Sequence, residues 1–400
     1  MAGAGPAGCA AAIAAAQSGL AVALLDKVAA FPREKACGDA LTPRSVATLS
    51  VLGIGLPASA HPVRGLAAWG RQDQPHRYGW PTTSGLPDVG YTVPRRALDD
   101  HLMAAAREAG VTVFLGQAVT GPLLEDARVT GVVAASGRSW RAPLVIDALG
   151  ASSNLGRQAG LPRLPGRPPA VAVRAYMRGA GIDDDWLHSW LALDGPDHAP
   201  LPGYGWVFPL GDGMYNVGVG QLATGAGFRH TDYRRLLQTW VSTLPASWQL
   251  SWDDSPIVGA ALPMGIDRAS PSRPGLLLVG DAAGLVNPFN GEGVSYALES
   301  GRLAGRSAAS TVPGESYSRE IAEEFGRYFA AGRLFAKMMG HQRVLDACLH
   351  YGLPRPAIMR PVNKLMANLI APQGGPLDDR LLRGALRLMR KPPFRGAHLL

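Results

Sequence analysis

The sequence has few cysteines: only Cys9, Cys37 and Cys348 occur among 400 residues. They are too few and too widely spaced for a disulfide framework or a closed zinc site, so we expect no disulfide and no metal site. A chain with this cysteine usage fits a reducing compartment. We therefore expect the protein to be cytoplasmic.

Long apolar runs are also missing. A membrane-spanning helix needs about 20 consecutive apolar residues. The alanine-rich stretch from Cys9 to Ala16 is much shorter and directly follows a glycine turn. We therefore expect no segment of this sequence to cross a bilayer.

Acidic residues are scarce near the C-terminus. Residues 341–400 contain ten Lys and Arg but three Asp and Glu, a difference of +7 within a net charge of +8. No nucleic-acid recognition motif accompanies this charge, so we expect no nucleic-acid partner. The spacing instead predicts a basic amphipathic helix on an anionic membrane surface, or a helix packed on the protein with a solvated basic face. Its apolar positions are Leu377, Leu381, Leu382, Ala385, Leu386, Leu388 and Met389, and its basic positions are Arg380, Arg383, Arg387 and Arg390.

What is abundant is glycine, with 50 residues, and the first glycine cluster opens the chain. Gly3, Gly5 and Gly8 precede a helix-forming stretch over residues 9–18, and a short apolar strand over residues 20–25 follows. Such a turn lets the backbone approach a pyrophosphate at a helix N-terminus. Asp26, after that strand, is placed to accept hydrogen bonds from an adenosine ribose.

The first strand of the expected nucleotide-binding sheet is missing from the sequence as written. Only Met1 and Ala2 precede the glycines, although that strand normally lies at the centre of the sheet. We therefore expect the natural start of the chain to lie elsewhere.

A second glycine cluster follows the apolar strand predicted over residues 275–279. A carboxylate at a strand end can bind ribityl hydroxyls, and a second helix start offers amides near an isoalloxazine ring. The two clusters together predict FAD as the cofactor. The residues of the second cluster are Gly280, Asp281, Gly284, Pro288, Gly291 and Gly293.

The order of predicted elements indicates a mixed α/β fold with discontinuous domains. A Rossmann-type FAD domain is expected from residues 1–61, 92–165 and 270–313, with helices over residues 96–110 and 293–309. An antiparallel substrate-binding sheet is expected from residues 62–91 and 166–269. Residues 314–400 are expected to be helical.

Three segments carry a resemblance to a known family. They are Lys35 to Pro43, then Gly203 to Pro209 leading to Asn216-Val-Gly218, and the second glycine cluster. In these the chain resembles the geranylgeranyl reductase family of FAD-dependent oxidoreductases. This resemblance implies the glutathione-reductase and hydroxylase-like flavoprotein fold.

Two shorter segments, Asp184-Asp185-Trp186 and Tyr351 to Pro356, look most like the actinobacterial menaquinone reductases. Those enzymes saturate one isoprene unit in the tail of menaquinone. The resemblance thus implies an isoprenoid C=C reductase whose substrate is a membrane-embedded prenyl lipid or quinone, and a protein peripherally associated with the cell membrane.

The resemblance also implies roles for individual residues. Cys37 is expected beside the flavin as a catalytic residue, and Arg95 is expected to contact the flavin side. Gly3, Gly5, Gly8 and Asp26 would hold the ADP half of FAD, and Asp281 the ribityl chain. The aromatic residues expected to line a prenyl cavity are Tyr204, Trp206 and Phe208.

One departure from related flavoproteins concerns the reductant. Those proteins usually have Asp-Gly-Ala-x-Ser where this chain has Leu149-Gly-Ala-Ser-Ser153, and the nearest acid is Asp147. That carboxylate normally organises the cofactor region and nicotinamide access. The electron donor, NADPH or another, is therefore left open.

Three other functions remain open from the sequence. The protein could reduce geranylgeranyl lipids, or be a flavin monooxygenase or halogenase of the same superfamily. It could also be a non-catalytic protein that binds FAD or prenyl lipids. Halogenases need a lysine near the flavin that we cannot identify here.

Overall fold

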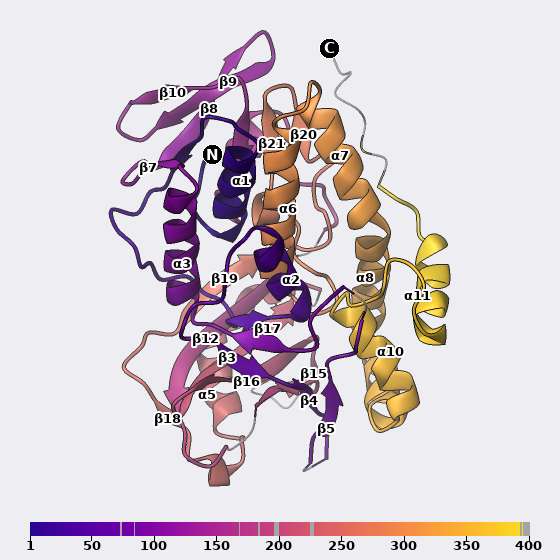
Figure 1. Ribbon diagram of the computed structural model, residues 1–400. Helices are drawn as coiled ribbons and strands as arrows, with labels where there is room; N and C mark the ends of the chain where they lie inside the picture. Colours follow the sequence, from indigo (N-terminus) through magenta and orange to yellow (C-terminus); the bar gives the residue numbers. More distant parts are fainter. Residues whose placement is uncertain are drawn as a thin grey trace.

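The computed structural model describes residues 1–72, 74–83, 85–167, 169–182, 185–195, 200–224, 228–392 and 394. Figure 1 shows a parallel-sheet layer with its helices, a large, mostly antiparallel sheet below it and a column of C-terminal helices along one side. The α-helices are α1 Pro6–Gln17, α2 Pro43–Val51, α3 Arg95–Glu108, α4 Leu155–Gln158, α5 Tyr233–Val241, α6 Val294–Ser307, α7 Pro313–Glu324, α8 Gly326–Met339, α9 Gln342–Ala347, α10 Pro356–Met366 and α11 Leu377–Arg387.

The strands fall into one parallel layer, one large sheet and several smaller ribbons. Their bounds are β1 Ala23–Leu25, β2 Ala40–Leu41, β3 His61–Val63, β4 Gly65–Trp69, β5 His76–Gly79, β6 Gly90–Thr92, β7 Thr112–Phe114, β8 Val119–Glu125, β9 Arg128–Ala134, β10 Ser139–Arg141, β11 Val145–Asp147, β12 Ala170–Arg178, β13 Trp186–Trp190, β14 Leu193–Asp194, β15 Pro200–Leu201, β16 Gly203–Gly211, β17 Met214–Leu222, β18 Ser251–Trp252, β19 Val258–Leu262, β20 Ser272–Arg273 and β21 Leu276–Leu278.

The parallel layer is built around the start of the chain. β1 pairs with β7 and β11 with β21, both in parallel. Ala2 joins these pairs, because it forms parallel bridges with both Leu25 and Asp147. Its N–H donates to the carbonyl of Ile146 at 2.9 Å, and the Gly3 N–H donates to that of Leu25 at 2.7 Å. Ala2 thus occupies the central position at which the sequence lacked a strand, and the glycine turn leaves from there.

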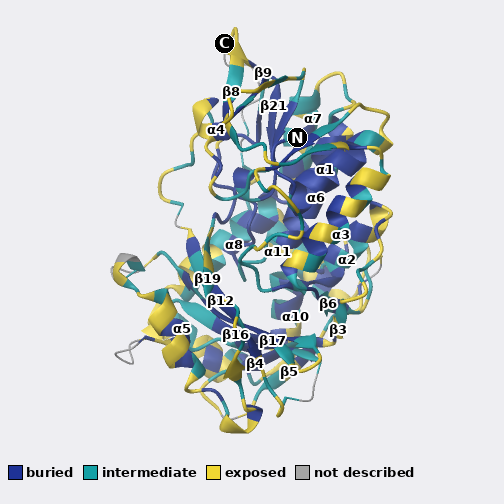
Figure 2. Ribbon diagram, turned by 90° about the vertical axis from the view of Figure 1, so that its left-hand side faces the viewer, coloured by how far each residue is buried: buried dark blue, intermediate teal, exposed yellow. Residues whose placement is uncertain are grey.

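Two helices pack closely behind this turn. A Cβ on Gly301 or Gly305 of α6 would overlap the carbonyl oxygen of Ala7 or Ala11 on α1. Because both helices carry small residues at the contact, their backbones can approach closely. Figure 2 shows that α1 and α6 are both largely buried. This packing fixes the N-termini of α1 and α6 relative to each other.

The large sheet has the strand order β18-β12-β17-β16-β13-β4-β5, and β19 also pairs with β12. β4 and β5 come from a much earlier part of the chain than their neighbour β13, with which β4 pairs in parallel. Two separate stretches of sequence therefore build one sheet. The exact domain boundaries that the sequence suggested stay a prediction.

Alternation along β16 sends its side chains to two faces. On one face, a Cβ on Gly205 would overlap the indole of Trp240 in α5, so this face is closely covered. Val207 is also fully buried, within the core that contains Trp240. Tyr204, Trp206 and Phe208 therefore share the opposite face.

The C-terminal helices pack beside both sheets (Figure 1). α11 is attached to α10 by a buried ion pair between Asp379 and Lys364, 2.7 Å apart. Arg383 also donates to the carbonyl of Ala371 at 2.6 Å. Among the helices of the described residues, none combines the length and apolarity that crossing a bilayer requires.

Candidate functional site

A cavity of about 910 Å³ lies where the parallel layer, the large sheet and the C-terminal helices meet. This volume is near the upper end of the range for ligand-binding pockets, about 300–1,000 Å³. One end is lined by residues of both glycine clusters, and the other by apolar side chains of β4, β13, α8, the short π-helix η4 (Cys348–Gly352) and α10. Representative residues of the apolar end are Leu66, Leu187, Phe335, Leu349, Met359 and Met366.

The first glycine turn can be made only by glycines at two of its positions. Gly3 has φ of +98°, and a Cβ there would overlap the carbonyl of Ala148. A Cβ on Gly8 would overlap the Gly3 carbonyl oxygen. Gly5 differs, since a Cβ there would meet only the end of the Arg33 side chain, at 2.8 Å. α1 begins at Pro6 without a capping side chain, which leaves a helix N-terminus beside the cavity, as a pyrophosphate requires.

Asp26 directly follows β1 and lies beside this turn. Its Oδ2 accepts from the Ala4 N–H at 2.7 Å and from Arg33 at 3.2 Å. Arg33 also donates to Asp99 at 2.9 Å. Arg33 thus joins the turn to α3 and lines the cavity, a role that no sequence motif indicated because residues 26–39 have no regular structure.

Arg95 begins α3 and makes two hydrogen bonds with Asp99, at 3.0 and 3.1 Å. Both side chains are buried, and Arg95 lines the cavity. The guanidinium also contacts Cys37, whose pKa it tends to lower. The structure therefore brings two residues predicted from separate motifs, Arg95 and Cys37, together.

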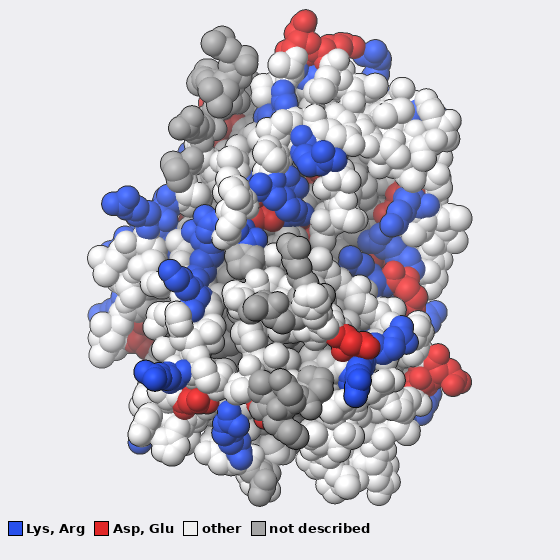
Figure 3. Space-filling model, turned by 180° about the vertical axis from the view of Figure 1, so that it is seen from behind, with Lys and Arg blue, Asp and Glu red and all other residues white. Residues whose placement is uncertain are grey.

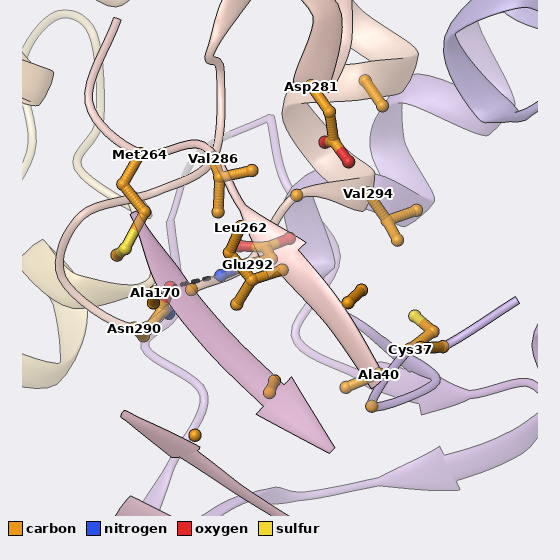
Figure 4. Close-up of a pocket in the computed structure, with 18 of the residues that line it drawn as sticks. Cys37, Ala40, Ala170, Leu262, Met264, Asp281, Val286, Asn290, Glu292 and Val294 are labelled. Atoms are coloured by element: carbon orange, nitrogen blue, oxygen red, sulfur yellow. Dashed lines mark hydrogen bonds between the residues drawn. The ribbon is translucent and has the colours of Figure 1, made fainter. Parts of the chain in front are cut away.

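The second glycine cluster forms a turn after β21. Gly280 and Gly284 have φ of +52° and +74°, and the Gly280 N–H donates to Ser300 of α6 at 2.9 Å. Asp281 directs its carboxylate toward the cavity (Figure 4). Burial raises the pKa of Asp281, opposed by the charges of Lys35 and Arg95.

The loop before α6 is held by its own asparagines. The Phe289 N–H donates to Asn287 at 2.9 Å, and the Glu292 N–H donates to Asn290 at 3.0 Å (Figure 4). Gly291 has φ of +77°, and α6 starts after Gly293 without a capping side chain. A second helix N-terminus therefore faces the cavity. The predicted residues Pro288, Gly291 and Gly293 all line it.

Cys37 is half-buried and lines the cavity close to Ala40 (Figure 4). Burial raises the pKa of the Cys37 thiol, opposed by Arg95. The Asp39 N–H donates to the Cys37 sulfur at 3.3 Å. The thiol therefore stays protonated near neutral pH and is held beside groups that stabilise a thiolate.

Asp39 lies in the segment from Lys35 to Pro43, but the sequence assigned no role to this residue. It is buried, and its carboxylate accepts from the Arg95 N–H at 3.0 Å, Tyr176 at 2.9 Å and Asn216 at 2.7 Å. Burial raises the pKa of Asp39 to about 6, although these hydrogen bonds oppose the shift. Only the tertiary structure brings its partners together, because they come from α3, β12 and β17.

Glu292, between Gly291 and Gly293 of the second cluster, is a further site residue to which the sequence assigned no role. Its side chain lies at the cavity, and Oε1 accepts from Ser295 and, at 3.2 Å, from Thr42. Burial raises the pKa of Glu292. Tyr204 lies near this carboxyl group. Burial raises the pKa of Tyr204 to about 12, and the charge of Glu292 contributes to the same shift.

The three predicted aromatic residues all line the cavity. Tyr204 donates its hydroxyl hydrogen to the Asn290 carbonyl at 2.7 Å, and the Trp206 indole donates to Asn216 at 2.8 Å. Their polar atoms are thus satisfied by the protein. The Phe208 ring adds a wholly apolar surface.

Asp147 is the acidic residue nearest to Leu149-Gly-Ala-Ser-Ser153, the segment that stands where related flavoproteins usually have Asp-Gly-Ala-x-Ser. It is fully buried at the end of β11, where it accepts from Ser153 at 2.6 Å and from the Leu149 N–H at 3.1 Å. Its carboxylate therefore shapes the turn after β11 locally.

FAD fits this site. Two uncapped helix N-termini and the glycine turn suit the pyrophosphate and the flavin, and the carboxylates of Asp26 and Asp281 suit ribose and ribityl hydroxyls. Fold and site together define an FAD-dependent oxidoreductase, and the pattern of the family described as "FAD dependent oxidoreductase" matches residues 1–199.

Comparison with known proteins narrows the class. The chain is 37% identical over 398 residues to menaquinone reductase of Mycobacterium tuberculosis, covering 98% of this chain and 97% of that one. It is 28% identical over 328 residues to digeranylgeranylglycerophospholipid reductase of Thermoplasma acidophilum, covering 81% and 80%. The crystal structure of a geranylgeranyl bacteriochlorophyll reductase-like protein from Thermoplasma acidophilum matches with a TM-score of 0.78 and 25% identity, covering 96% and 97%.

The chain belongs to the geranylgeranyl reductase family of FAD-dependent oxidoreductases. The family, the FAD cofactor and the mixed α/β hydroxylase-like fold that the sequence predicted are confirmed. The roles of the individual site residues stay predictions.

Proposed function

We propose that this protein reduces a C=C bond in the prenyl tail of menaquinone. The observation that carries the proposal is the shape of the cavity, a single pocket that extends from the two glycine clusters to a predominantly apolar end. A polyprenyl tail is a long apolar chain with a reactive double bond in each unit. The cavity offers such a chain both a flavin site and a path past it.

The walls of the apolar end come from two different parts of the fold. The large sheet supplies Leu66 and Leu187, and the C-terminal helices supply Phe335, Met359 and Met366. Aromatic and aliphatic surfaces bind such a chain without a polar desolvation cost. The identity of 37% to a menaquinone reductase supports menaquinone as the substrate.

Reduced FAD, when bound, supplies the hydride. The protein then has to orient the alkene, exclude water and deliver a proton. The aromatic face of β16 would exclude water beside the double bond, which suppresses side reactions of a developing cation. Cys37 would donate the proton from its Sγ, since burial keeps the thiol protonated and Arg95 lies beside the thiolate that remains.

In this proposal Gly3, Gly5, Gly8 and Asp26 hold the ADP half of FAD, while Arg95 and Asp281 contact its flavin side. All of these residues line the cavity except Gly8, which packs against the Gly3 carbonyl behind the turn, and this placement supports the assignment. The remaining residues proposed to shape the flavin site are Gly280, Gly284, Pro288, Gly291 and Gly293.

The test is to incubate dithionite-reduced, FAD-loaded protein with menaquinone and, separately, with geranylgeranyl phospholipids. After the quinone ring has been reoxidised in air, menaquinone is expected to retain a gain of 2 mass units, about one reduced double bond of the tail per turnover. Reduction of the phospholipid alone would favour the second candidate, a geranylgeranyl-lipid reductase. Oxygen uptake coupled to an oxygenated or halogenated product would indicate a monooxygenase or halogenase. If the reduced, FAD-loaded protein reduces neither lipid and forms no oxygenated or halogenated product, the result would indicate a non-catalytic binding protein.

We further propose that α11 rests on an anionic membrane surface. Leu377, Leu381 and Leu388 lie on α11 or at its end and are 70%, 65% and 81% exposed. Arg380 and Arg387 lie along one edge of this stripe and are exposed as well. An outward apolar stripe with arginines along one edge suits an interface with acidic lipids, and it lies on the same helical column that lines the cavity.

Among the described residues, the charges on the back face of the protein do not form a large basic patch of the kind that would bind a polyanion (Figure 3). On the face seen from behind, Lys and Arg occur in several groups with Asp and Glu between them (Figure 3). A cytoplasmic protein that reaches its lipid substrate through α11 would be consistent with both features. Nucleic acid is not part of this proposal.

A further inference from the structure

We infer that Asn216 is a positioning residue for the Cys37 thiol and that it links this thiol to the aromatic wall at Trp206. The inference rests on the role proposed above for Cys37. Asn216 lies on β17, far from Cys37 in the sequence, and it orients the thiol that is proposed to donate the proton.

The thiol needs such a residue because its own segment is irregular. Residues 26–39, between β1 and β2, contain no helix or strand. Cys37 is therefore not oriented by a ladder of backbone hydrogen bonds. Its direction depends on side chains from other elements.

Asn216 supplies two of these contacts from one amide group. Its Nδ2 donates to the Cys37 carbonyl at 2.8 Å and to Asp39 Oδ2 at 2.7 Å. Both amide hydrogens are thereby used across the Cys37 turn. Asn216 is completely buried, so water cannot replace these bonds.

Trp206 determines which way the amide of Asn216 points. The indole N–H donates to Asn216 Oδ1 at 2.8 Å. A flipped amide would direct its oxygen at two acceptors, the Cys37 carbonyl and the Asp39 carboxylate, and would offer a donor to the indole N–H. The indole therefore fixes the orientation in which Asn216 can bind the turn.

The other side of the turn is fixed as well. Asp39 Oδ1 accepts from the Arg95 N–H at 3.0 Å, and the Asp39 N–H donates to the Cys37 sulfur at 3.3 Å. Asp39 adopts a left-handed φ of +64°, which a non-glycine residue holds only with tertiary support. Asn216 and Arg95 thus hold the Asp39 carboxylate from two sides, and the N–H of the same residue reaches the thiol.

Close packing links this unit to the aromatic wall. A Cβ on Gly38 would lie 3.5 Å from the Phe208 ring and 3.8 Å from the Trp206 indole nitrogen. A Cβ on Gly218 would overlap the Trp206 indole. The indole therefore has one place to lie, between β17 and the Cys37 turn. A prenyl chain against Trp206 would rest on the same unit that orients the thiol.

The sharpest test is Asn216→Asp in FAD-loaded protein. This isosteric change keeps the acceptor for Trp206 but replaces the two-bond donor by an oxygen facing two acceptors. We expect kcat for prenyl reduction to fall on the order of 100-fold with KM nearly unchanged, as for a displacement of a reacting group by about 1 Å. The neighbouring Tyr215→Phe is the matched control, since Tyr215 bonds Ile182 from the opposite face at 2.7 Å. It should keep both values.

A second readout needs no prenyl substrate. In a Cys348→Ser background, which removes the exposed thiol, iodoacetamide alkylation of Cys37 is followed as a function of pH in FAD-loaded protein. Cys9 is fully buried and should stay unmodified. Asn216→Asp is expected to change the rate of Cys37 alkylation severalfold and to shift the pH at which alkylation is half-maximal. Tyr215→Phe should change neither.

Trp206→Phe provides an independent variant if Asn216→Asp does not fold, because it keeps an aromatic ring on the wall but removes the indole N–H together with the volume of the second ring. It should change Cys37 alkylation in the same direction. Unchanged alkylation together with unchanged kcat, or a rise in KM alone, would overturn the inference. If wild-type protein reduces no prenyl lipid, the proposed function fails, but alkylation still decides whether Asn216 positions the thiol.

Discussion

Tyr204 donates its hydroxyl hydrogen to the carbonyl oxygen of Asn290 at 2.7 Å, and this bond connects the aromatic wall of β16 to the loop before α6. Asn290 in turn accepts from the Glu292 N–H at 3.0 Å. The proposed prenyl surface and the proposed flavin loop are thus held in one arrangement. The family and cofactor are established by comparison, whereas the consequences of such contacts are open to experiment.

Tyr204→Phe should separate the ring from its hydroxyl group. The apolar wall stays, but the Asn290 carbonyl loses its donor in a buried setting, so the free energy of unfolding should fall by about 1 kcal/mol. Urea denaturation of the FAD-loaded protein measures this change. A stability equal to wild type would mean that the loop before α6 is held by Asn287 and Asn290 alone.

Gly8→Ala should abolish FAD binding. The added Cβ would overlap the Gly3 carbonyl oxygen, so the turn and the start of α1 must move apart. Gly55→Ala is the control, because a Cβ there has open space within 4 Å. Flavin absorbance after reconstitution and desalting gives the result. FAD retained by Gly8→Ala would contradict the pyrophosphate site.

Asp39→Asn should change how stability depends on pH. Burial raises the Asp39 pKa from 3.8 to about 6, so the folded protein holds this proton more tightly than the unfolded chain. The contribution is fully present below about pH 4 and is lost as pH rises through about 6, a change of about 3 kcal/mol for a buried group. The variant should lose this part of the slope in urea denaturation between pH 4 and 7. Asp88→Asn, at an exposed site, should keep the wild-type profile.

Cys37→Ser should bind FAD normally yet lose most turnover with prenyl substrate. A hydroxyl group of ordinary acidity cannot replace a thiol beside Arg95 as proton donor. Single-turnover oxidation of the reduced flavin by substrate is the measurement, with Cys348→Ser as the control for a thiol at the apolar end of the cavity, away from the glycine clusters. An unchanged single-turnover rate would remove Cys37 from the mechanism.

The triple change Leu377→Ser, Leu381→Ser and Leu388→Ser should weaken binding to vesicles of anionic phospholipid. These side chains are exposed, so folding and the flavin spectrum should be unaffected. Co-sedimentation is the readout. Val51→Ser with Leu124→Ser, also exposed apolar positions, is the control. Equal sedimentation of both variants would exclude α11 as the contact.

The predicted basic amphipathic helix shows what sequence periodicity leaves undecided. The structure places a helix at residues 377–387, close to the prediction, but attaches it to α10 through the Asp379–Lys364 pair. Periodicity alone could not distinguish a helix packed on the body from one facing lipid. The structure shows features of both, a packed side and an outward leucine stripe, and residues 395–400 of the tail lie outside the described residues.

The sequence by itself determined the cofactor and the family, because glycine turns, a carboxylate after a strand and an aromatic motif are local patterns. Helix α3, predicted over residues 96–110, was also accessible from local periodicity. Arg33 and Asp39 were not, because their partners lie on other elements and their segment is irregular. Only the tertiary structure brought Cys37, Asp39 and Asn216 together, since long-range hydrogen bonds between β17 and the residue 26–39 segment have no signature in local sequence.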